Sequence, residues 1–177
     1  MTNAKRQAIY LNDHLAGATV GIELARRTLA ENNDAQLGAF LRAFLTEIEE
    51  DRDTLVRLMH SLGVARSAVK IAGAWTAEKV GRLKPNGQMR GYSPLSRLIE
   101  LEGLALGVEG KRSLWLAFAA VRNHDERLPD IDFAALAERA RSQRERLEPH
   151  RLAAAVEALT NRAIANCPEE TNQEFGG

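Results

Sequence analysis

Apolar residues recur along four stretches of this chain at the spacing of an α-helix. The clearest is 35–62, where leucine, isoleucine and phenylalanine return every three or four residues and form one stripe along a helical face. Comparable stripes run through 4–31, through 94–122 and from about 132 into the 160s. The pattern therefore predicts an all-α protein built from four long helices.

The residues between these stretches predict how the helices connect. Asp34 is suited to cap the start of the second helix, Gly63 to end it, and Ser93 with Pro94 to begin the third. The links before Asp34 and at 123–129 are short, whereas roughly 30 residues separate the second and third helices. This arrangement predicts a bundle with one long crossover.

Two further features concern helix continuity. A weaker helical period at 66–83 predicts an additional short helix within the crossover. In the last helix, Pro149 removes a backbone donor, which predicts a kink or a division into two helices. We expect a single domain over 1–167, followed by a flexible tail at 168–177.

Composition narrows the class of protein. Hydrophobic residues make up 45% of the 177 residues, enough for a core, and 24 basic residues balance 24 acidic ones. The charge balance argues against a nucleic-acid partner. The single cysteine, Cys167, indicates a reducing compartment, and the lack of a signal-peptide core or a long apolar run indicates no membrane association. We therefore expect a cytoplasmic protein.

A few charged residues interrupt the apolar stripes and are the candidate site residues. Asp51 stands in the stripe of the second helix, Glu102 and Glu109 in one stripe of the third, and Arg144 in that of the last. His14 lies at the edge of the stripe of the first helix. A charge inside an apolar seam must be paired, neutralised, metal-bound or hydrated.

The helix arrangement, the acids on helices two and three and the stretch YLNDHLAGATVGIELARR (10–27) together resemble the ferritin-like superfamily, in particular small bacterial ferritin-like domains. The resemblance implies a four-helix bundle with a long crossover and a di-iron or di-manganese centre. It implies two Glu and two Glu-x-x-His ligand pairs. Glu23 and either Glu100 or Glu102 match the single glutamates, but both Glu-x-x-His pairs are absent.

Besides a simple surface location of these groups, two interpretations follow. In the first, the chain is a non-catalytic bundle whose metal site is lost, and an interior ion pair of Asp51, Glu102 and Arg144 takes its place. In the second, it is a metal-binding redox or storage protein that holds iron or manganese at an atypical carboxylate site. The metal ligands would then come from His14, Asp51, Glu102 and Glu109. The first interpretation assigns no catalytic residue and no cofactor.

Other patterns suggest partners. A homodimer is expected, because the first helix is apolar on more than one side. Its many Ala and Gly residues, with Trp75 as a cap, suggest a pocket for a small apolar ligand. An acidic run at 47–53 and a basic run at 139–151 are either solvated faces or complementary surfaces between helices or subunits.

Overall fold

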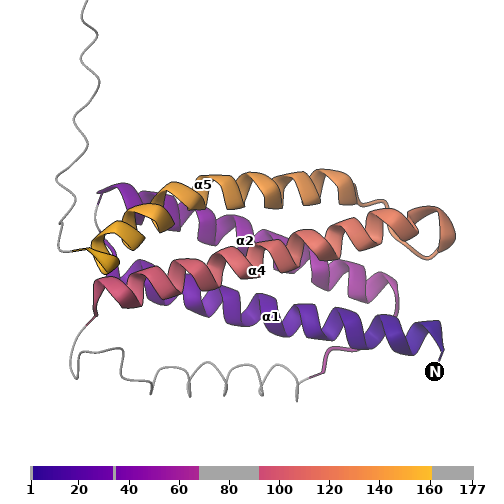
Figure 1. The fold of residues 1–177 in the computed structure, drawn as a ribbon. Coiled ribbons are helices and arrows are strands. Elements are labelled where there is room, and N and C mark those ends of the chain that lie inside the picture. The colour runs from indigo at the N-terminus through magenta and orange to yellow at the C-terminus, as the bar shows by residue number, and fades with distance from the viewer. Residues whose placement is uncertain (1, 34, 68–91, 161–177) are drawn as a thin grey trace, which may run out of the picture.

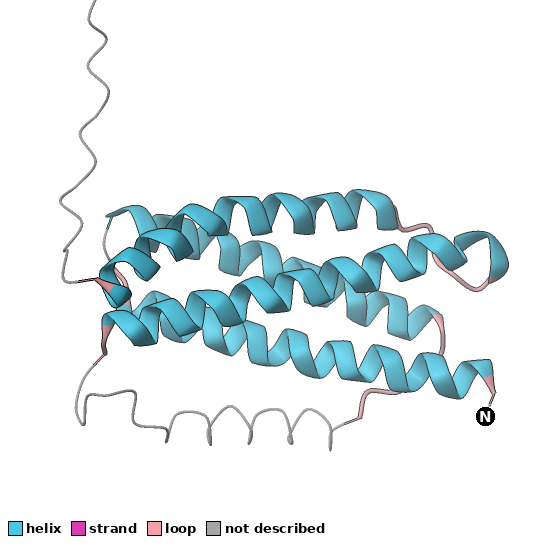
Figure 2. Cartoon of the chain, viewed as in Figure 1, coloured by secondary structure: helices cyan, strands magenta, loops and turns pink. Residues whose placement is uncertain are grey.

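The computed structural model describes residues 2–33, 35–67 and 92–160. Four long helices, α1 (Asn3–Glu31), α2 (Ala35–Ser61), α4 (Pro94–Val121) and α5 (Phe133–Leu159), account for most of them, and a 3-10 turn, η1 (Arg122–His124), follows α4 (Figures 1 and 2). Since the described ranges contain no strand, the all-α prediction is confirmed. None of their helices is long and apolar enough to span a membrane.

Several expected features fall outside the described residues. These are Asp34, residues 68–83 of the expected crossover helix, Trp75, Cys167 and the expected tail at 168–177.

Local sequence explains where the helices begin and end. The hydroxyl of Ser93 accepts a hydrogen bond from Ser96 N at 3.1 Å, and Pro94 occupies the first turn of α4. The carboxylate of Asp132 caps α5 by accepting from Ala135 N at 2.9 Å. After α2, Gly63 adopts a left-handed φ of 66° that favours glycine, and the chain closes in a Schellman motif.

The directions of the helices follow from contacts at their ends. Gln7 near the start of α1 donates to Asp125 beyond the end of α4, and Arg27 near the end of α1 pairs with Glu100 near the start of α4. Thus α1 is antiparallel to α4 and, across a short turn, to α2 (Figure 1). Both α2 and α4 therefore run opposite to α1 and end at the same end of the bundle, and α5 returns antiparallel to α4.

The apolar core consists of two clusters, one toward each end of the bundle. The first contains Leu15 of α1, Leu55 of α2 and Leu114 of α4, and the second contains Ala25, Leu41 and Val108 of the same helices. Between them lies a level at which α2, α4 and α5 contribute Asp51, Lys111 and Gln143, all polar. This level, called the polar layer below, positions the candidate site.

The buried side of α4 differs from the expected one. The stripe that carries Glu102 and Glu109 faces largely outward, with Leu106 75% exposed. The core side is the second apolar face, formed by Leu101, Leu104, Val108, Trp115 and Phe118. Because α4 is apolar on most of its circumference, periodicity alone does not identify the buried face.

Of the two outcomes expected at Pro149, a kink or a division of the last helix, the structure contradicts the division. The helix α5 runs from Phe133 to Leu159 with Pro149 inside it, so the proline does not divide the helix in two. The next residue, His150, stacks on Phe40 of α2 with ring centroids 4.6 Å apart. This contact places the region after the proline against α2.

Candidate functional site: a polar layer beside a glycine-lined cavity

Three side chains from three helices form the centre of the polar layer. The Lys111 ammonium of α4 donates to Asp51 Oδ2 on α2 and, at 2.5 Å, to Gln143 Oε1 on α5. Gln143 Nε2 in turn donates to Asp51 Oδ2 at 3.2 Å, which closes a ring of hydrogen bonds. Asp51 is 3% exposed, Gln143 is fully buried, and the Lys111 side chain is 16% exposed. A buried carboxylate and a buried ammonium thus neutralise each other.

Burial lowers the pKa of Lys111, because removal from water disfavours the charged ammonium, although the neighbouring Asp51 carboxylate opposes this shift. The second carboxylate oxygen, Asp51 Oδ1, accepts no hydrogen bond from the described residues. Arg139 Nε lies 3.5 Å from Oδ1, close enough for an ion pair but without hydrogen-bond geometry. Asp51 therefore has one carboxylate oxygen, Oδ1, that could accept a further hydrogen bond.

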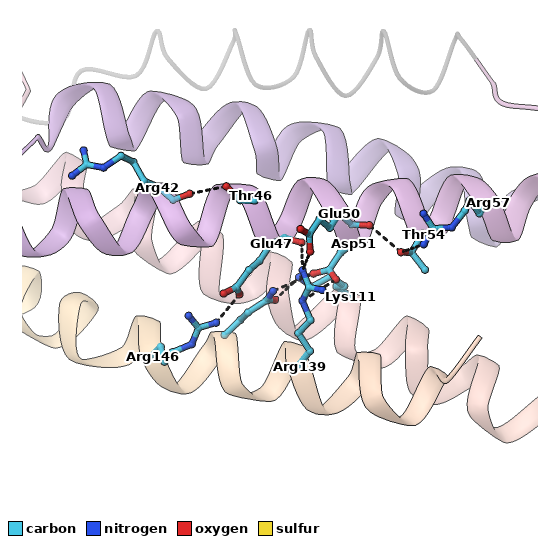
Figure 3. Close-up of polar contacts among 11 residues, drawn as sticks. Arg42, Thr46, Glu47, Glu50, Asp51, Thr54, Arg57, Lys111, Arg139 and Arg146 are labelled. Atoms are coloured by element: carbon cyan, nitrogen blue, oxygen red, sulfur yellow. Dashed lines mark hydrogen bonds and ion pairs between the residues drawn. The ribbon is translucent and has the colours of Figure 1, made fainter. Parts of the chain in front are cut away.

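Charged side chains extend the layer across the space between α2 and α5 (Figure 3). Arg139 donates to Glu50 Oε2 at 2.8 Å and to the Glu47 carbonyl at 2.8 Å, and Arg146 donates to Glu47 Oε2 at 2.6 Å. Burial alone would raise the pKa of Glu47, but the hydrogen bonds from Arg146 and Gln143 outweigh it and lower the pKa. These contacts link the acidic run of α2 to the basic run of α5.

The remaining arginines of the basic run pair mostly within α5. Arg141 pairs with Glu138 and Glu145, and Arg144 and Arg151 share Glu148. The basic run is therefore interleaved with glutamates, as its sequence indicates.

A cavity of about 200 Å³ lies beside the polar layer, between α1, α2 and α4. Asp51 and Lys111 form part of its wall, and Phe44 and Trp115 contribute aromatic surface. Its other lining residues are mostly small or apolar: Gly17, Ala18, Gly21, Ile48, Leu55, Leu104, Gly107, Val108, Gly110 and Leu114. Exposed Asp13 and Gly17 lie at its rim, so the cavity reaches the surface.

The glycines create part of this space. A Cβ atom built at Gly17, Gly21, Gly107 or Gly110 would meet no atom within 4 Å. In contrast, a Cβ at Gly103, one helical turn before Gly107, would lie 3.0 Å from a Leu24 methyl. Close helix packing therefore explains Gly103, whereas the other four positions border open space.

One buried donor, on a side chain that lines the cavity, is unsatisfied. Trp115 is fully buried, and its indole Nε1 has no hydrogen-bond partner among the described residues. Leaving a buried donor unpaired costs about 1–3 kcal/mol. His14, also in the wall, packs edge-on against Tyr10, and burial lowers the pKa of His14 despite the nearby Asp13 carboxylate.

The structure does not bring the predicted site residues together. Glu102 lies at the surface 3.5 Å from Arg151, and exposed Glu109 pairs with Arg112. Arg144 pairs along its own helix with Glu148 rather than with Asp51. The expected ion pair of Asp51, Glu102 and Arg144 is therefore not the one present, because α4 presents another face and the α5 side chain in the core is Gln143.

Lys111 and Gln143 were not predicted from the sequence, although the helical position of each indicates a buried side chain. Lys111 occupies a place in the heptad series of the second apolar face of α4, seven residues after Leu104 and four before Trp115. Gln143 precedes Leu147 by one turn and falls on the buried side of α5.

A second buried polar cluster at the far end of the bundle was also missed. Glu100, 7% exposed, accepts from Arg27 at 2.8 Å and from the Tyr92 hydroxyl at 2.9 Å. Tyr92 accepts from buried Asn32, whose oxygen accepts from Arg97. Burial raises the pKa of Tyr92. This cluster joins the end of α1 to the start of α4.

The predicted metal ligands do not fit a metal centre. His14 and Asp51 both line the cavity, but Glu102 and Glu109 lie on the outer side of α4. Over residues 2–33, 35–67 and 92–160, no three His, Cys, Asp or Glu side chains are placed to hold a metal ion. The cations beside Asp51 are the protein's own, the Lys111 ammonium and the Arg139 guanidinium.

Comparisons with protein-family models, with curated proteins and with solved structures find no match to this chain. The polar layer and its cavity are therefore the basis for assigning a function.

Proposed function

We propose that this protein is a non-catalytic, metal-free bundle with ferritin-like connectivity that binds a small molecule in the cavity between α1, α2 and α4. The observation that carries the proposal is the polar layer together with the cavity beside it. There, Lys111 neutralises Asp51 internally, and glycines leave about 200 Å³ open beside the pair. A preformed, mostly apolar cavity with a few polar groups is typical of small-molecule sites.

The ferritin-like part of the proposal is supported by the order and direction of the helices. Two antiparallel pairs are connected so that α2 and α4 run in the same direction, as a bundle with one long crossover requires. In the ferritin-like di-metal proteins, interior carboxylates and imidazoles hold the metals. Here an ammonium and an amide contact the interior carboxylate.

Metal titration tests the metal-free part. We expect Fe(II), Mn(II) and Zn(II) to leave the thermal midpoint of the purified protein unchanged. A stoichiometric metal that raises the midpoint of the wild type, but not of Asp51→Asn, would support the redox or storage alternative instead.

Toluene provides a generic probe of the cavity. We expect saturable shifts of the amide resonances of Gly21, Ile48 and Leu104 in protein-observed NMR, and no such shifts in Gly21→Leu. Ala43→Leu, which adds the same side chain at an exposed site of α2 away from the cavity, is the control and should bind toluene normally. The absence of saturable binding to the wild type would refute the proposed function.

The expected homodimer and cytoplasmic location belong to the same proposal. Large apolar side chains remain exposed on adjacent helices α4 and α5: Leu95, Ile99, Leu106, Leu116, Leu152, Val156 and Leu159. The pair Glu102 and Arg151 lies on the same two helices, so the face carries both charge signs and suits a second copy. Sedimentation equilibrium should show a dimer that Leu106→Glu converts to monomer; a monomeric wild type would refute it.

A further inference from the structure

The ion pair of Lys111 and Asp51 crosses the interior of the bundle. Each of α2 and α4 packs against α1 and α5, so α2 and α4 lie at opposite corners (Figure 1). The hydrogen bond from Lys111 Nζ of α4 to Asp51 Oδ2 of α2 therefore joins opposite corners (Figure 3). The amine of Lys111 thus lies deep in the fold rather than at its surface.

One side of this ion pair faces the cavity. Gln143 of α5 accepts a hydrogen bond from the same ammonium at 2.5 Å, whereas the cavity is lined by residues of α1, α2 and α4, both Asp51 and Lys111 among them. The Lys111 side chain points into the bundle and is still 16% exposed, and the open space beside it is the cavity. Because the cavity reaches the surface at exposed Gly17, a small molecule that enters it meets the ion pair.

The amine of Lys111 has the properties of a lysine that reacts with carbonyl compounds. An ammonium has three N–H donors, and the described residues accept from this one at two atoms, Asp51 Oδ2 and Gln143 Oε1. Burial lowers the pKa of Lys111, which increases the share of the neutral, nucleophilic amine. Asp51 is in place to take the ammonium proton and to return it. Desolvated lysines of this kind form Schiff bases in proteins.

We infer that Lys111 forms a reversible imine with a small apolar aldehyde or ketone that occupies the cavity. The inference rests on the proposed function, namely that the cavity binds a small molecule. The cavity is lined mostly by aliphatic, aromatic and glycine residues, which suit an apolar body. Its volume of about 200 Å³ exceeds that of an apolar cavity of about 150 Å³ that holds benzene, so a ring with one carbonyl group fits.

The reaction balances within the Asp51–Lys111 pair. The ammonium transfers one proton to Asp51, and the resulting amine adds to the carbonyl carbon while one N–H proton moves to the carbonyl oxygen. The hydroxyl so formed leaves as water with the proton held by Asp51, and a C=N bond replaces the C=O bond. The iminium keeps the positive charge of Lys111 and its pairing with the Asp51 carboxylate. No oxidant, reductant or cofactor is consumed.

Benzaldehyde with sodium cyanoborohydride tests the inference on the full-length protein. The hydride reduces the imine to a stable benzylamine, and peptide mapping by mass spectrometry locates each benzyl group. Exposed Lys5 of α1 is the internal control, because it meets the same reagents outside the cavity. We expect the labelling of Lys111 to saturate with benzaldehyde concentration and the labelling of Lys5 to rise linearly.

Two perturbations test whether the label depends on the cavity. At subsaturating benzaldehyde, toluene at about ten times its own Kd should lower Lys111 labelling about tenfold by competition. Gly21→Leu, which fills the cavity, should lower it at least as much, whereas Ala43→Leu should be labelled as wild type. Neither perturbation should change the labelling of Lys5. Lys111→Met should lose the benzyl group at this position alone; if it does not fold, the wild-type peptide map with and without toluene still decides.

The outcomes separate this inference from the proposed function. If Lys5 is labelled and Lys111 is not, the imine inference is overturned. It is also overturned if Lys111 is labelled but neither toluene nor Gly21→Leu reduces that label. Saturable binding of toluene in the NMR titration would then leave the proposed function standing, and the absence of toluene binding would remove both.

Discussion

Replacement of Asp51 with asparagine tests the energetic role of the polar layer directly. The change keeps the shape of the side chain but removes the charge that neutralises Lys111, which is only 16% exposed. Removing one partner of a buried ion pair costs about 3–5 kcal/mol, because the other charge remains buried. The cost has an upper limit, since Lys111 can lose its proton instead.

That limit can be estimated. Deprotonating a lysine with an ordinary pKa of about 10.4 at pH 7 costs about 1.4 kcal/mol per pH unit, or close to 5 kcal/mol. Because Lys111 is partly exposed, the expected loss in the free energy of unfolding lies at the lower end of the 3–5 kcal/mol range, at about 3 kcal/mol. For a chain of this length, such a loss lowers the thermal midpoint by about 6–12 °C.

The assay is urea denaturation followed by circular dichroism at pH 7. Asp53→Asn is the matched control, because it makes the same chemical change two residues away at a side chain that is 58% exposed. We expect it to change the free energy of unfolding by no more than about 0.5 kcal/mol. The triple variant Asp51→Leu, Lys111→Met, Gln143→Leu should be neutral or about 1–4 kcal/mol more stable than wild type.

Two results would refute this reasoning. A loss below about 1 kcal/mol in Asp51→Asn would mean that Lys111 reaches water and needs no buried partner. A triple variant as unstable as Asp51→Asn would mean that the layer is held by more than the mutual neutralisation of its members.

Four other predictions follow from the same structure. The pKa of Lys111 is lowered in the folded protein, so between that pKa and about 10.4 the unfolded chain binds more protons than the folded one. In this pH window the free energy of unfolding of the wild type should therefore rise with pH, whereas that of Lys111→Met should not. Urea denaturation at several pH values measures both. Burial also lowers the pKa of His14, so the wild type should lose stability relative to His14→Gln as pH falls below about 6.5. Gly17→Ala should stabilise the fold by about 0.5–1 kcal/mol, whereas Gly103→Ala, which places a Cβ 3.0 Å from a leucine methyl, should not; equal gains would contradict the packing described. Tyr92→Phe leaves two buried partners, Asn32 and Glu100, without its hydroxyl and should cost about 1–3 kcal/mol in urea denaturation. An unchanged free energy of unfolding would mean that these groups are hydrated rather than buried.

Periodicity, capping residues and turn residues were sufficient to predict the helices. The four expected stretches agree with α1, α2, α4 and α5 to within a few residues. Ser93 and Asp132 cap the starts of α4 and α5, and Gly63 adopts the left-handed conformation that follows α2. These features depend on local interactions, which the sequence contains in full. The all-α class followed, whereas the ferritin-like relationship remains a proposal.

The face of α4 could not be predicted in the same way. A helix that is apolar on two sides buries whichever side its neighbours contact. The stripe of Glu102 and Glu109, which was expected to face the core, contains Leu106, and this side chain is 75% exposed. On α5 the error was a single residue, since Arg144 and Gln143 differ by about 100° around the helix. Side-chain length also matters, because arginine at the edge of a buried face extends to solvent.

The depth of each residue along the bundle provides a criterion that periodicity lacks. Asp51 lies ten residues before the end of α2 at Ser61, Lys111 ten before the end of α4 at Val121, and Gln143 ten after the start of α5 at Phe133. These three helix ends lie at the same end of the bundle, so each residue is about 15 Å along its helix from that end.

Level and face together select the residues that meet. Glu102 lies nineteen residues from Val121, about 13 Å beyond the level of Asp51, so no rotation of α4 would bring the two together. Glu109 lies near the right level but on the outer face. Lys111 satisfies both conditions, and α1 contributes Gly17, Ala18 and Gly21 to the cavity wall, with Asp13 and His14 beside them. The polar layer and the cavity are therefore one feature: three helices contribute a neutralised polar ring, and the fourth leaves space beside it.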